Sequence, residues 1–366
     1  MLNILFMGTP DFAMESLKAI YEAKFNIVGV VTNPDKPQGR GMKVSYTPVK
    51  KYALEKNIPI YQPEHIKNNP EMLKTIKKIN PDVICVVAYG KILPKEILDI
   101  PRFGAINVHG SLLPKYRGAA PIQWAVINGD KTTGITTMYM DEGMDTGDMI
   151  LKKEVFIEDN ETTGMLWERL SKMGGELLVE TLKKVENDIA PRTKQQGEAS
   201  YAPMLNKEMA RIDWENKTAS EIKNLVRGLN PIMGAYSYLD GKKLKIWKIE
   251  RISNEDFFET HLEFKEYSKK FLDIRCRNNY LYRQKRRNLC KSKRWGFANI
   301  RIASRKCKKN ECTRFFKGKQ YRSRTNFWIT TCQKGRGILA HVCQEGWTFF
   351  KNNAKKPLVK NPVPVS

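Results

Sequence analysis

The chain has 366 residues, enough for two or three domains with a sizeable hydrophobic core. No segment approaches the roughly 18 apolar residues that a membrane-spanning helix needs, and the opening MLNILFMG lacks the basic start and the length of a secretion signal. We therefore expect a soluble, cytoplasmic protein with no membrane partner.

The formal net charge of +25 is concentrated in the last quarter of the chain. Residues 271–366 contain 25 Lys and Arg against 3 Asp and Glu, whereas residues 1–270 contain 39 against 36. Cysteine follows the same division, because Cys85 lies before residue 271 and the other six follow it. A uniformly basic chain would indicate a nucleic-acid or membrane partner. This distribution indicates instead that two different compositions are joined.

Short apolar segments alternate with helical or loop segments through the first 190 residues. Residues 9–23 predict a helix, and the three- to five-residue spacing of Leu and Met predicts another over residues 163–185. The alternation is typical of an α/β domain with a doubly wound, Rossmann-like parallel sheet. The expected strands span residues 2–8, 25–32, 82–90, 104–109 and 134–140.

A polar, aperiodic segment with two prolines at residues 190–205 predicts a linker after a first domain at 1–189. A second, smaller domain is expected from residue 206 to about 270. It begins with a helix near residues 218–229 and a hairpin that turns at Asp240-Gly241. Beyond about residue 271 the local signals no longer agree with one another.

The strongest candidates for chemistry lie at the end of the strand predicted at residues 104–109. Ligands of open α/β sheets bind at the carboxyl ends of strands, and Asn107 and His109, two residues apart, share one face. The next strand leads into DEGMDTGD, a glycine-broken acidic loop. We expect this loop to bring Asp145 alongside the other two side chains.

An amide donor, a chargeable imidazole and a carboxylate suit acyl transfer without a covalent intermediate. Asn107 would donate a hydrogen bond to the developing oxyanion, and His109 as an imidazolium would stabilise it further. Asp145 would hold His109 charged and relay a proton through water. No nucleophilic side chain is needed for this chemistry.

Other interpretations of these motifs remain open. Asn107 and His109 could form a hydrogen-bonded structural pair, and DEGMDTGD could be a solvated turn or a weak calcium loop, although it lacks the EF-hand spacing. FMGTP departs from G-x-G-x-x-G and does not favour nicotinamide binding. The four histidines are too scattered to predict a metal site, so we expect no metal.

Seven stretches, taken together, match one known family in order from residue 1 to about residue 250. They are FMGTPDFA, TNPDKPQGRGMKVSYTPVK, VVAYGKILP, INVHGSLLPKYRGAAPIQW, MDEGMDTGDM, ARIDW and NPIMGAY. On them the chain resembles the methionyl-tRNA formyltransferases, a branch of the formyltetrahydrofolate-dependent formyltransferases. The GRG loop and ARIDW point to the tRNA branch rather than to enzymes that act on an amino sugar or a ribonucleotide amine.

The resemblance implies 10-formyltetrahydrofolate as formyl donor and the α-amine of methionine on initiator tRNA as acceptor, with the enzyme acting as a monomer. Asn107, His109 and Asp145 fall on the family's catalytic positions. Two further groups would bind the folate, a turn that contacts it and a backbone segment that walls the pterin pocket. The turn is Ser111, Leu112, Leu113 and Pro114, and the wall is Val87, Ala88, Tyr89 and Gly90.

The loop at residues 33–43 carries Lys36, Arg40 and Lys43 on a backbone rich in Pro and Gly. Taken alone it would be a solvated surface loop. The resemblance implies that it enters the tRNA acceptor stem, with phosphate contacts that weaken as salt rises.

The family continues into a β-barrel-like (OB-like) domain, but this chain departs from the pattern after about residue 271. Back-translated and shifted one base forward, residues 295–320 can encode GVLLILELQVENVKRMSVRDFLKGNN, and residues 283–294 can encode GKKEGIFVKAKD. Both are plausible family sequence. In the same frame residues 327–329 can encode Phe-Gly-stop, close to the family's expected end.

We therefore predict a single-base frameshift near residues 265–275, in the gene or in its sequencing. The second domain would be truncated or scrambled, and residues 271–366 would be a disordered read-through tail. The competing interpretation is a basic RNA-binding tail, either on the enzyme or on a non-catalytic RNA-binding protein. It does not explain the recoverable family sequence.

Overall fold

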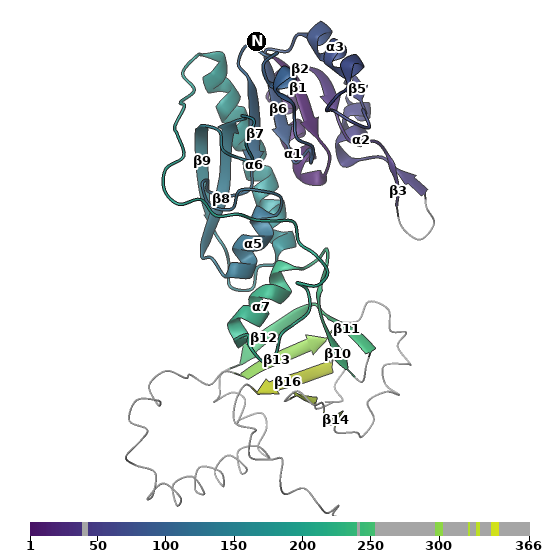
Figure 1. The fold of residues 1–366 in the computed structure, drawn as a ribbon, viewed down its shortest axis with the longest axis vertical. Coiled ribbons are helices and arrows are strands. Elements are labelled where there is room, and N and C mark those ends of the chain that lie inside the picture. Colours follow the sequence, from purple (N-terminus) through teal and green to yellow (C-terminus); the bar gives the residue numbers. More distant parts are fainter. Residues whose placement is uncertain are drawn as a thin grey trace, which may run out of the picture. The chain divides into compact units, whose positions relative to one another are not determined.

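The computed structural model describes residues 1–38, 43–239, 242–252, 297–302, 321–322, 327–329 and 338–343. The chain divides into two compact units (Figure 1). The first comprises Met1–Ala210 and Asn224–Gly234, and the second comprises Arg211–Lys223 and Ala235–Ser366. Among the described residues, no helix is long and apolar enough to cross a membrane.

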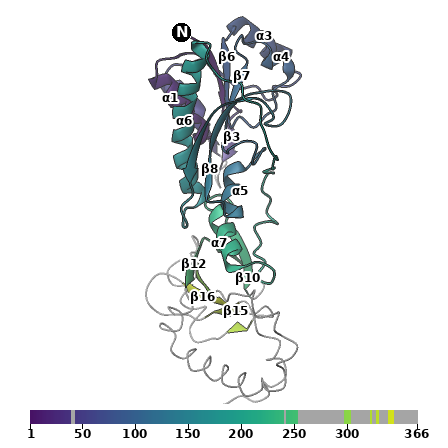
Figure 2. The same cartoon turned by 90° about the vertical axis from the view of Figure 1, so that its left-hand side faces the viewer.

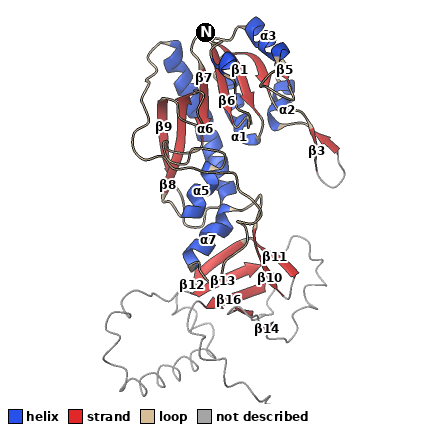
Figure 3. Cartoon of the chain, in the orientation of Figure 1, coloured by secondary structure: helices blue, strands red, loops and turns tan. Residues whose placement is uncertain are grey.

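A seven-stranded sheet with the order β5-β2-β1-β6-β7-β8-β9 forms the centre of the first unit (Figure 3). Neighbours from β5 to β7 pair in parallel, whereas β8 runs antiparallel to β7 and β9 antiparallel to β8. The mostly parallel, Rossmann-like sheet confirms the predicted fold class. The strands are β1 (Asn3–Gly8), β2 (Asn26–Val31), β5 (Ile60–Tyr61), β6 (Val83–Val87), β7 (Ala105–His109), β8 (Thr132–Tyr139) and β9 (Met149–Phe156).

The direction of β8 corrects the expectation that this strand also runs parallel. The connection from β7 contains one short helix, α5 (Pro121–Asn128). It brings the chain into β8 beside the end of β7, so β8 runs back along β7 with His109 opposite Thr136. An antiparallel pair of this kind needs no crossover to the opposite edge of the sheet.

Helices cover both faces of the sheet, as expected for a doubly wound fold (Figure 2). Ile4 and Phe6 belong to a buried cluster with residues of α1 and α6, whereas Leu5 and Met7 belong to a second cluster with residues of α3 and α4. Alternate residues of β1 thus enter opposite cores. The helices are α1 (Asp11–Glu22), α2 (Pro48–Glu55), α3 (Pro70–Ile79), α4 (Lys95–Leu98) and α6 (Thr163–Glu186).

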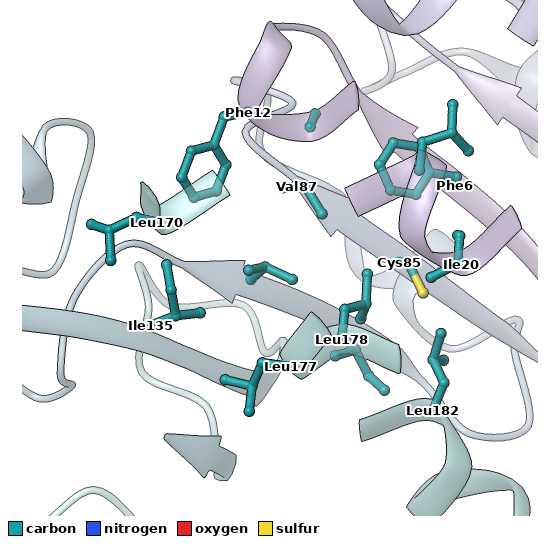
Figure 4. Packing of buried hydrophobic residues seen from close by; sticks show 14 of the residues in the cluster. Phe6, Phe12, Ile20, Cys85, Val87, Ile135, Leu170, Leu177, Leu178 and Leu182 are labelled. Carbon is teal, nitrogen blue, oxygen red and sulfur yellow. The ribbon is translucent and has the colours of Figure 1, made fainter. Parts of the chain in front are cut away.

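The predicted helix at residues 163–185 is confirmed as α6. It begins after Thr162, whose side chain accepts a hydrogen bond from the Met165 amide. Its apolar face packs on α1 and on the sheet, and Leu170, Leu177, Leu178 and Leu182 lie in this core together with Cys85 (Figure 4). Burial raises the pKa of the Cys85 thiol well above its usual range.

A small hairpin leaves the first unit between β2 and α2. Its strands, β3 (Lys36–Gln38) and β4 (Lys43–Ser45), pair antiparallel with Lys36 opposite Ser45. Residues 39–42, and with them Arg40, lie outside the described residues.

The second unit contains the predicted hairpin, formed by β10 (Ala235–Leu239) and β11 (Lys242–Ile246). Leu239 pairs with Lys242, and the predicted turn residues between them, 240–241, lie outside the described residues. The predicted helix is confirmed as α7 (Ala219–Gly228), which begins in the second unit and ends in the first.

Four short segments beyond residue 271 form a five-stranded sheet with β12 (Lys248–Ile252). Its order is β12-β13-β16-β15-β14, and each neighbouring pair is antiparallel. The remaining residues of 271–366 lie outside the described residues, so the predicted barrel, frameshift and disorder stay predictions. The four segments are β13 (Phe297–Ile302), β14 (Tyr321–Arg322), β15 (Phe327–Ile329) and β16 (Ile338–Cys343).

Candidate active site

The end of β7 presents the amide and the imidazole on the same face of the sheet. Asn107 and His109 alternate with Val108, which packs in the core cluster beneath. His109 is 5% exposed, whereas Asn107 is partly exposed. The strand therefore holds both groups rigidly, and Asn107 remains accessible to a ligand.

Asp145 reaches this pair from the loop between β8 and β9. Its Oδ1 lies 3.4 Å from Asn107 Nδ2, and its Oδ2 lies 3.6 Å from His109 Nδ1. The amide of Gly118 donates to the same Oδ2 at 2.8 Å. The structure thus brings the three predicted side chains together, as expected.

The route by which Asp145 arrives differs from the expectation. Because β8 is antiparallel to β7, its carboxyl end lies beside Ile106, near the start of β7. The loop then turns back, and the Tyr139 amide donates to the Asp148 carbonyl at 2.9 Å. Asp145 meets Asn107 from within this loop, with a positive φ of 54°, which residues other than Gly seldom adopt.

Both ring nitrogens of His109 face hydrogen-bond acceptors. Nε2 lies 2.8 Å from the Tyr116 carbonyl oxygen, which can only accept, so Nε2 carries a hydrogen. Nδ1 faces the Asp145 carboxylate at 3.6 Å. The ring thus lies between a backbone carbonyl and a carboxylate.

The turn predicted to contact folate is held from β8 and β9. The Thr136 hydroxyl donates to the Ser111 carbonyl at 2.7 Å and accepts from the Leu113 amide at 3.2 Å. Lys152 Nζ donates to the Leu113 carbonyl at 2.6 Å, and burial lowers the pKa of this lysine. These bonds hold Ser111–Pro114 in a defined position, with Leu112 and Pro114 partly exposed.

The predicted wall at residues 87–90 follows the end of β6. Val87 is buried in the sheet, whereas Ala88 and Gly90 are exposed and have φ angles of 44° and 77°. The Tyr89 ring is 1% exposed in the core, where burial raises its pKa to about 12. Its side chain therefore belongs to the core, and the backbone of this segment is what a ligand could contact.

An ion-pair network anchors the base of the β3–β4 hairpin. The ammonium of Lys50 pairs with Asp35 and donates to Gln62 Oε1 at 2.7 Å. Gln62 in turn donates to Asp35 Oδ1 at 3.1 Å and to the Asn33 carbonyl at 2.9 Å. Burial alone would raise the pKa of Asp35, but the hydrogen bonds from Lys50 and Gln62 and the charge of Lys50 together outweigh it and lower the pKa. Of the predicted tRNA contacts, Lys36 and Lys43 lie on the strands of this hairpin.

Several groups that support the site were not predicted from the sequence: Tyr116, Gly118, Thr136 and Lys152. Tyr116 and Gly118 act through backbone atoms, which leave no mark on residue type. Thr136 could have been found only from the strand register, because it lies opposite His109 on an antiparallel neighbour. Among the described residues, no group of three or more His, Cys, Asp or Glu side chains could hold a metal ion.

Comparison with known proteins decides the family. Residues 2–182 match the sequence profile of the formyl transferases, and residues 204–293 match the profile of the formyl transferase C-terminal domain. The methionyl-tRNA formyltransferase of Caldanaerobacter subterraneus is 55% identical over 254 residues, which cover 69% of this chain and 82% of that protein. The chain belongs to the methionyl-tRNA formyltransferase family. The Acetivibrio thermocellus member is 52% identical over 256 residues, covering 70% of this chain and 82% of that protein.

Solved structures of other formyltransferases share the fold at low identity. The sugar 3N-formyl transferase WlaRD, crystallised with dTDP and 5-N-formyl-THF, superposes with a TM-score of 0.54 at 22% identity, covering 69% of this chain and 88% of that one. The N-formyltransferase of Helicobacter canadensis, in complex with folinic acid and dTDP-3-aminofucose, gives 0.53 at 22% identity with the same coverage. The family consists of enzymes that use formyl-folate donors, so this chain is a formyltransferase.

Proposed function

We propose that the chain transfers the formyl group of 10-formyltetrahydrofolate to the α-amino group of methionine on initiator tRNA. The observation that carries the proposal is the convergence of Asn107, His109 and Asp145 at one strand end, with separations of 3.4 and 3.6 Å. The identity of 52–55% to methionyl-tRNA formyltransferases supports this acceptor. We place the enzyme in the cytoplasm as a monomer.

The reaction joins the amine nitrogen to the formyl carbon and breaks the bond between that carbon and N10 of the folate. As the amine adds, the formyl oxygen becomes negative. Asn107 Nδ2 would donate to it, since its present bond to Asp145 is long at 3.4 Å. His109 as an imidazolium would stabilise the same charge.

Protons move in the opposite direction to the formyl group. The attacking nitrogen becomes positive and must lose a proton, while N10 must gain one as it leaves. Asp145 would relay this proton through water, because its carboxylate lies beside both other side chains. An α-amine has a pKa of about 7.7, so a neutral nucleophile is present near pH 7 and no strong base is needed.

Folate would lie against the turn Ser111–Pro114 and the backbone of residues 88–90. The partly exposed Leu112 and Pro114 offer apolar contact, and the left-handed conformations at Ala88 and Gly90 shape the backbone there. The initiator tRNA would contact the β3–β4 hairpin through Lys36, Arg40 and Lys43, whose charges suit phosphates.

An amino-sugar acceptor is the second possibility, because WlaRD and the Helicobacter enzyme share the fold. Their identity to this chain is 22%, against 52–55% for the tRNA enzymes. A test should offer radiolabelled formyltetrahydrofolate with charged initiator tRNA, a dTDP-amino sugar or a ribonucleotide amine. We expect label only in the tRNA fraction. Label in either other acceptor, or tRNA binding without folate-dependent transfer, would refute the proposed function.

We also propose that the native reading frame is lost near residues 265–275. The relatives align over 254 and 256 residues of this chain, about four-fifths of their own length. Sequencing codons 255–335 tests the proposal. An intact genomic frame, together with tryptic peptides from between residues 301 and 319, would overturn it. The 366-residue chain should bind initiator tRNA more weakly than a frame-corrected version.

A further inference from the structure

We propose that Gln195 is a positioning residue that holds the two loops of the catalytic site together, an inference that rests on the proposed function. Residues 190–205 carry no catalytic side chain and were predicted to be a linker. In the structure they belong to the first unit, which extends to Ala210. They form a strap across the loop of Asp145 and the turn that follows β7.

Backbone hydrogen bonds fix the strap on both sides of Gln195. Thr193 exchanges two bonds with Met149 at the start of β9, at 2.8 and 2.9 Å. Farther along, the Arg117 amide donates to the Ser200 carbonyl at 2.8 Å, and the Ala202 amide donates to the Arg117 carbonyl at 2.7 Å. The strap is therefore held at two places, with Gln195 between them.

The Gln195 amide uses its donors and its acceptor on different loops. Nε2 donates to the carbonyl oxygens of Asp145 at 2.8 Å and Gly147 at 2.9 Å. Oε1 accepts from Arg117 Nη2 at 2.7 Å and Nε at 3.1 Å. A carboxamide can serve both loops in this way, whereas a carboxylate has no donor for the two carbonyls.

Both contacts of Gln195 lead directly to catalytic groups. Arg117 lies between Tyr116, whose carbonyl accepts from His109, and Gly118, whose amide donates to Asp145 Oδ2. On the other side, Asp145 has a backbone conformation that is costly for a residue other than Gly. Gln195 thus supports the conformation that presents the carboxylate, without itself touching the reacting atoms.

The first test compares Gln195→Met with Gln196→Met in the full chain. Met keeps the length of the side chain but offers no amide, and Gln196 is an exposed neighbour that supplies a matched control. We expect Gln195→Met to lower kcat roughly 10- to 100-fold, with KM for both substrates changed by less than about twofold, because small displacements of catalytic groups are costly. Gln196→Met should match wild type.

Gln195→Glu separates the two contacts. The carboxylate can still accept from Arg117 but cannot donate to the Asp145 and Gly147 carbonyls. We expect kcat at or below that of Gln195→Met. Wild-type kcat in Gln195→Glu would overturn the inference, since the contact with Arg117 alone would then be sufficient. If Gln195→Met fails to fold, Gln195→Glu carries the test, with folding checked by circular dichroism.

A double-mutant cycle distinguishes positioning from general stabilisation. In an Asp145→Asn background, Gln195→Met should lower kcat by a smaller factor than in the wild-type background, because the part of its effect that acts through the Asp145 carboxylate is already lost. Full additivity of the two losses would overturn the inference. Amide hydrogen exchange gives a readout without turnover: Gln195→Met, unlike Gln196→Met, should accelerate exchange at residues 116–118 and 141–148. Unchanged exchange at these residues would refute the role of Gln195, whether or not the enzyme is active. Inactivity of the wild-type enzyme would instead refute the proposed function.

Discussion

The site at the end of β7 and the β3–β4 hairpin belong to the same unit but are built differently. At the site, His109 is 5% exposed and both of its nitrogens face protein acceptors, and loops from three parts of the chain interlock. The hairpin has two three-residue strands, anchored at its base by Lys50. Formyl transfer needs catalytic groups held in fixed positions, whereas phosphate recognition needs positive charges that extend from the surface. Substitutions at the site should therefore change kcat, and those at the hairpin should change KM for tRNA.

The largest effect is expected for His109→Ala. Loss of the imidazolium removes a charge that stabilises the oxyanion and part of the acid-base relay, so kcat should fall about 10³-fold. KM for either substrate should change little. Steady-state formylation measures both constants, with folding verified by circular dichroism. A fall of less than about tenfold would contradict the role given to this ring.

The next effect concerns the hairpin cations. Replacing Lys36, Arg40 and Lys43 together with Ala should raise KM for tRNA about 10- to 100-fold and leave kcat nearly unchanged. Each lost phosphate contact lowers the slope of log affinity against log salt by about 0.7–0.9. Titrating tRNA binding at several salt concentrations measures this slope. An unchanged slope would show that these cations do not contact phosphate.

A smaller effect is expected when the hairpin loses its anchor. Lys50→Met removes the ion pair with Asp35 and the bond to Gln62 while keeping an apolar stem of similar length. KM for tRNA should rise about three- to tenfold, which corresponds to about 1 kcal/mol. Lys51→Met, at an exposed neighbour, is the matched control. A fall in kcat with unchanged KM for tRNA would contradict the assignment of the hairpin to tRNA binding.

The smallest effect on activity is expected for Tyr116→Phe. The hydroxyl donates to Asp130 at 2.9 Å and accepts from Asn128 at 3.0 Å, whereas His109 bonds only the backbone carbonyl, which remains. The free energy of unfolding should fall by about 1 kcal/mol near pH 7, with kcat within about threefold of wild type. Urea unfolding and steady-state assays measure the two quantities.

The cost of Tyr116→Phe should depend on pH with a definite sign. Burial, the largest cause, raises the pKa of Tyr116 to about 12, against about 10 in an unfolded chain. The stability contributed by the neutral phenol is complete below about pH 10 and is lost as pH rises toward the folded value. The difference between wild type and Tyr116→Phe should therefore narrow above about pH 10. A widening difference would mean that the phenolate is favoured in the fold.

Local sequence pattern predicted a large part of this molecule. The period-2 alternation of β7 placed Asn107 and His109 on one face, and leucine spacing placed α6 within one residue of its observed end. The Asp-Gly pair predicted a hairpin, and the strands on either side of it, β10 and β11, do pair antiparallel. These features depend on residues a few positions apart, so a single segment carries the information that determines them.

Only the tertiary structure decided how distant segments assemble the site. The antiparallel direction of β8, the return of the loop that carries Asp145, and the bonds from Tyr116 and Gly118 follow from strand order and loop path. Gln195 lies 50 residues from Asp145, in a segment whose polar, aperiodic composition is typical of a linker. Contacts with backbone carbonyls and amides impose little on residue type, so no local pattern records them, and they exist only once distant segments have packed together.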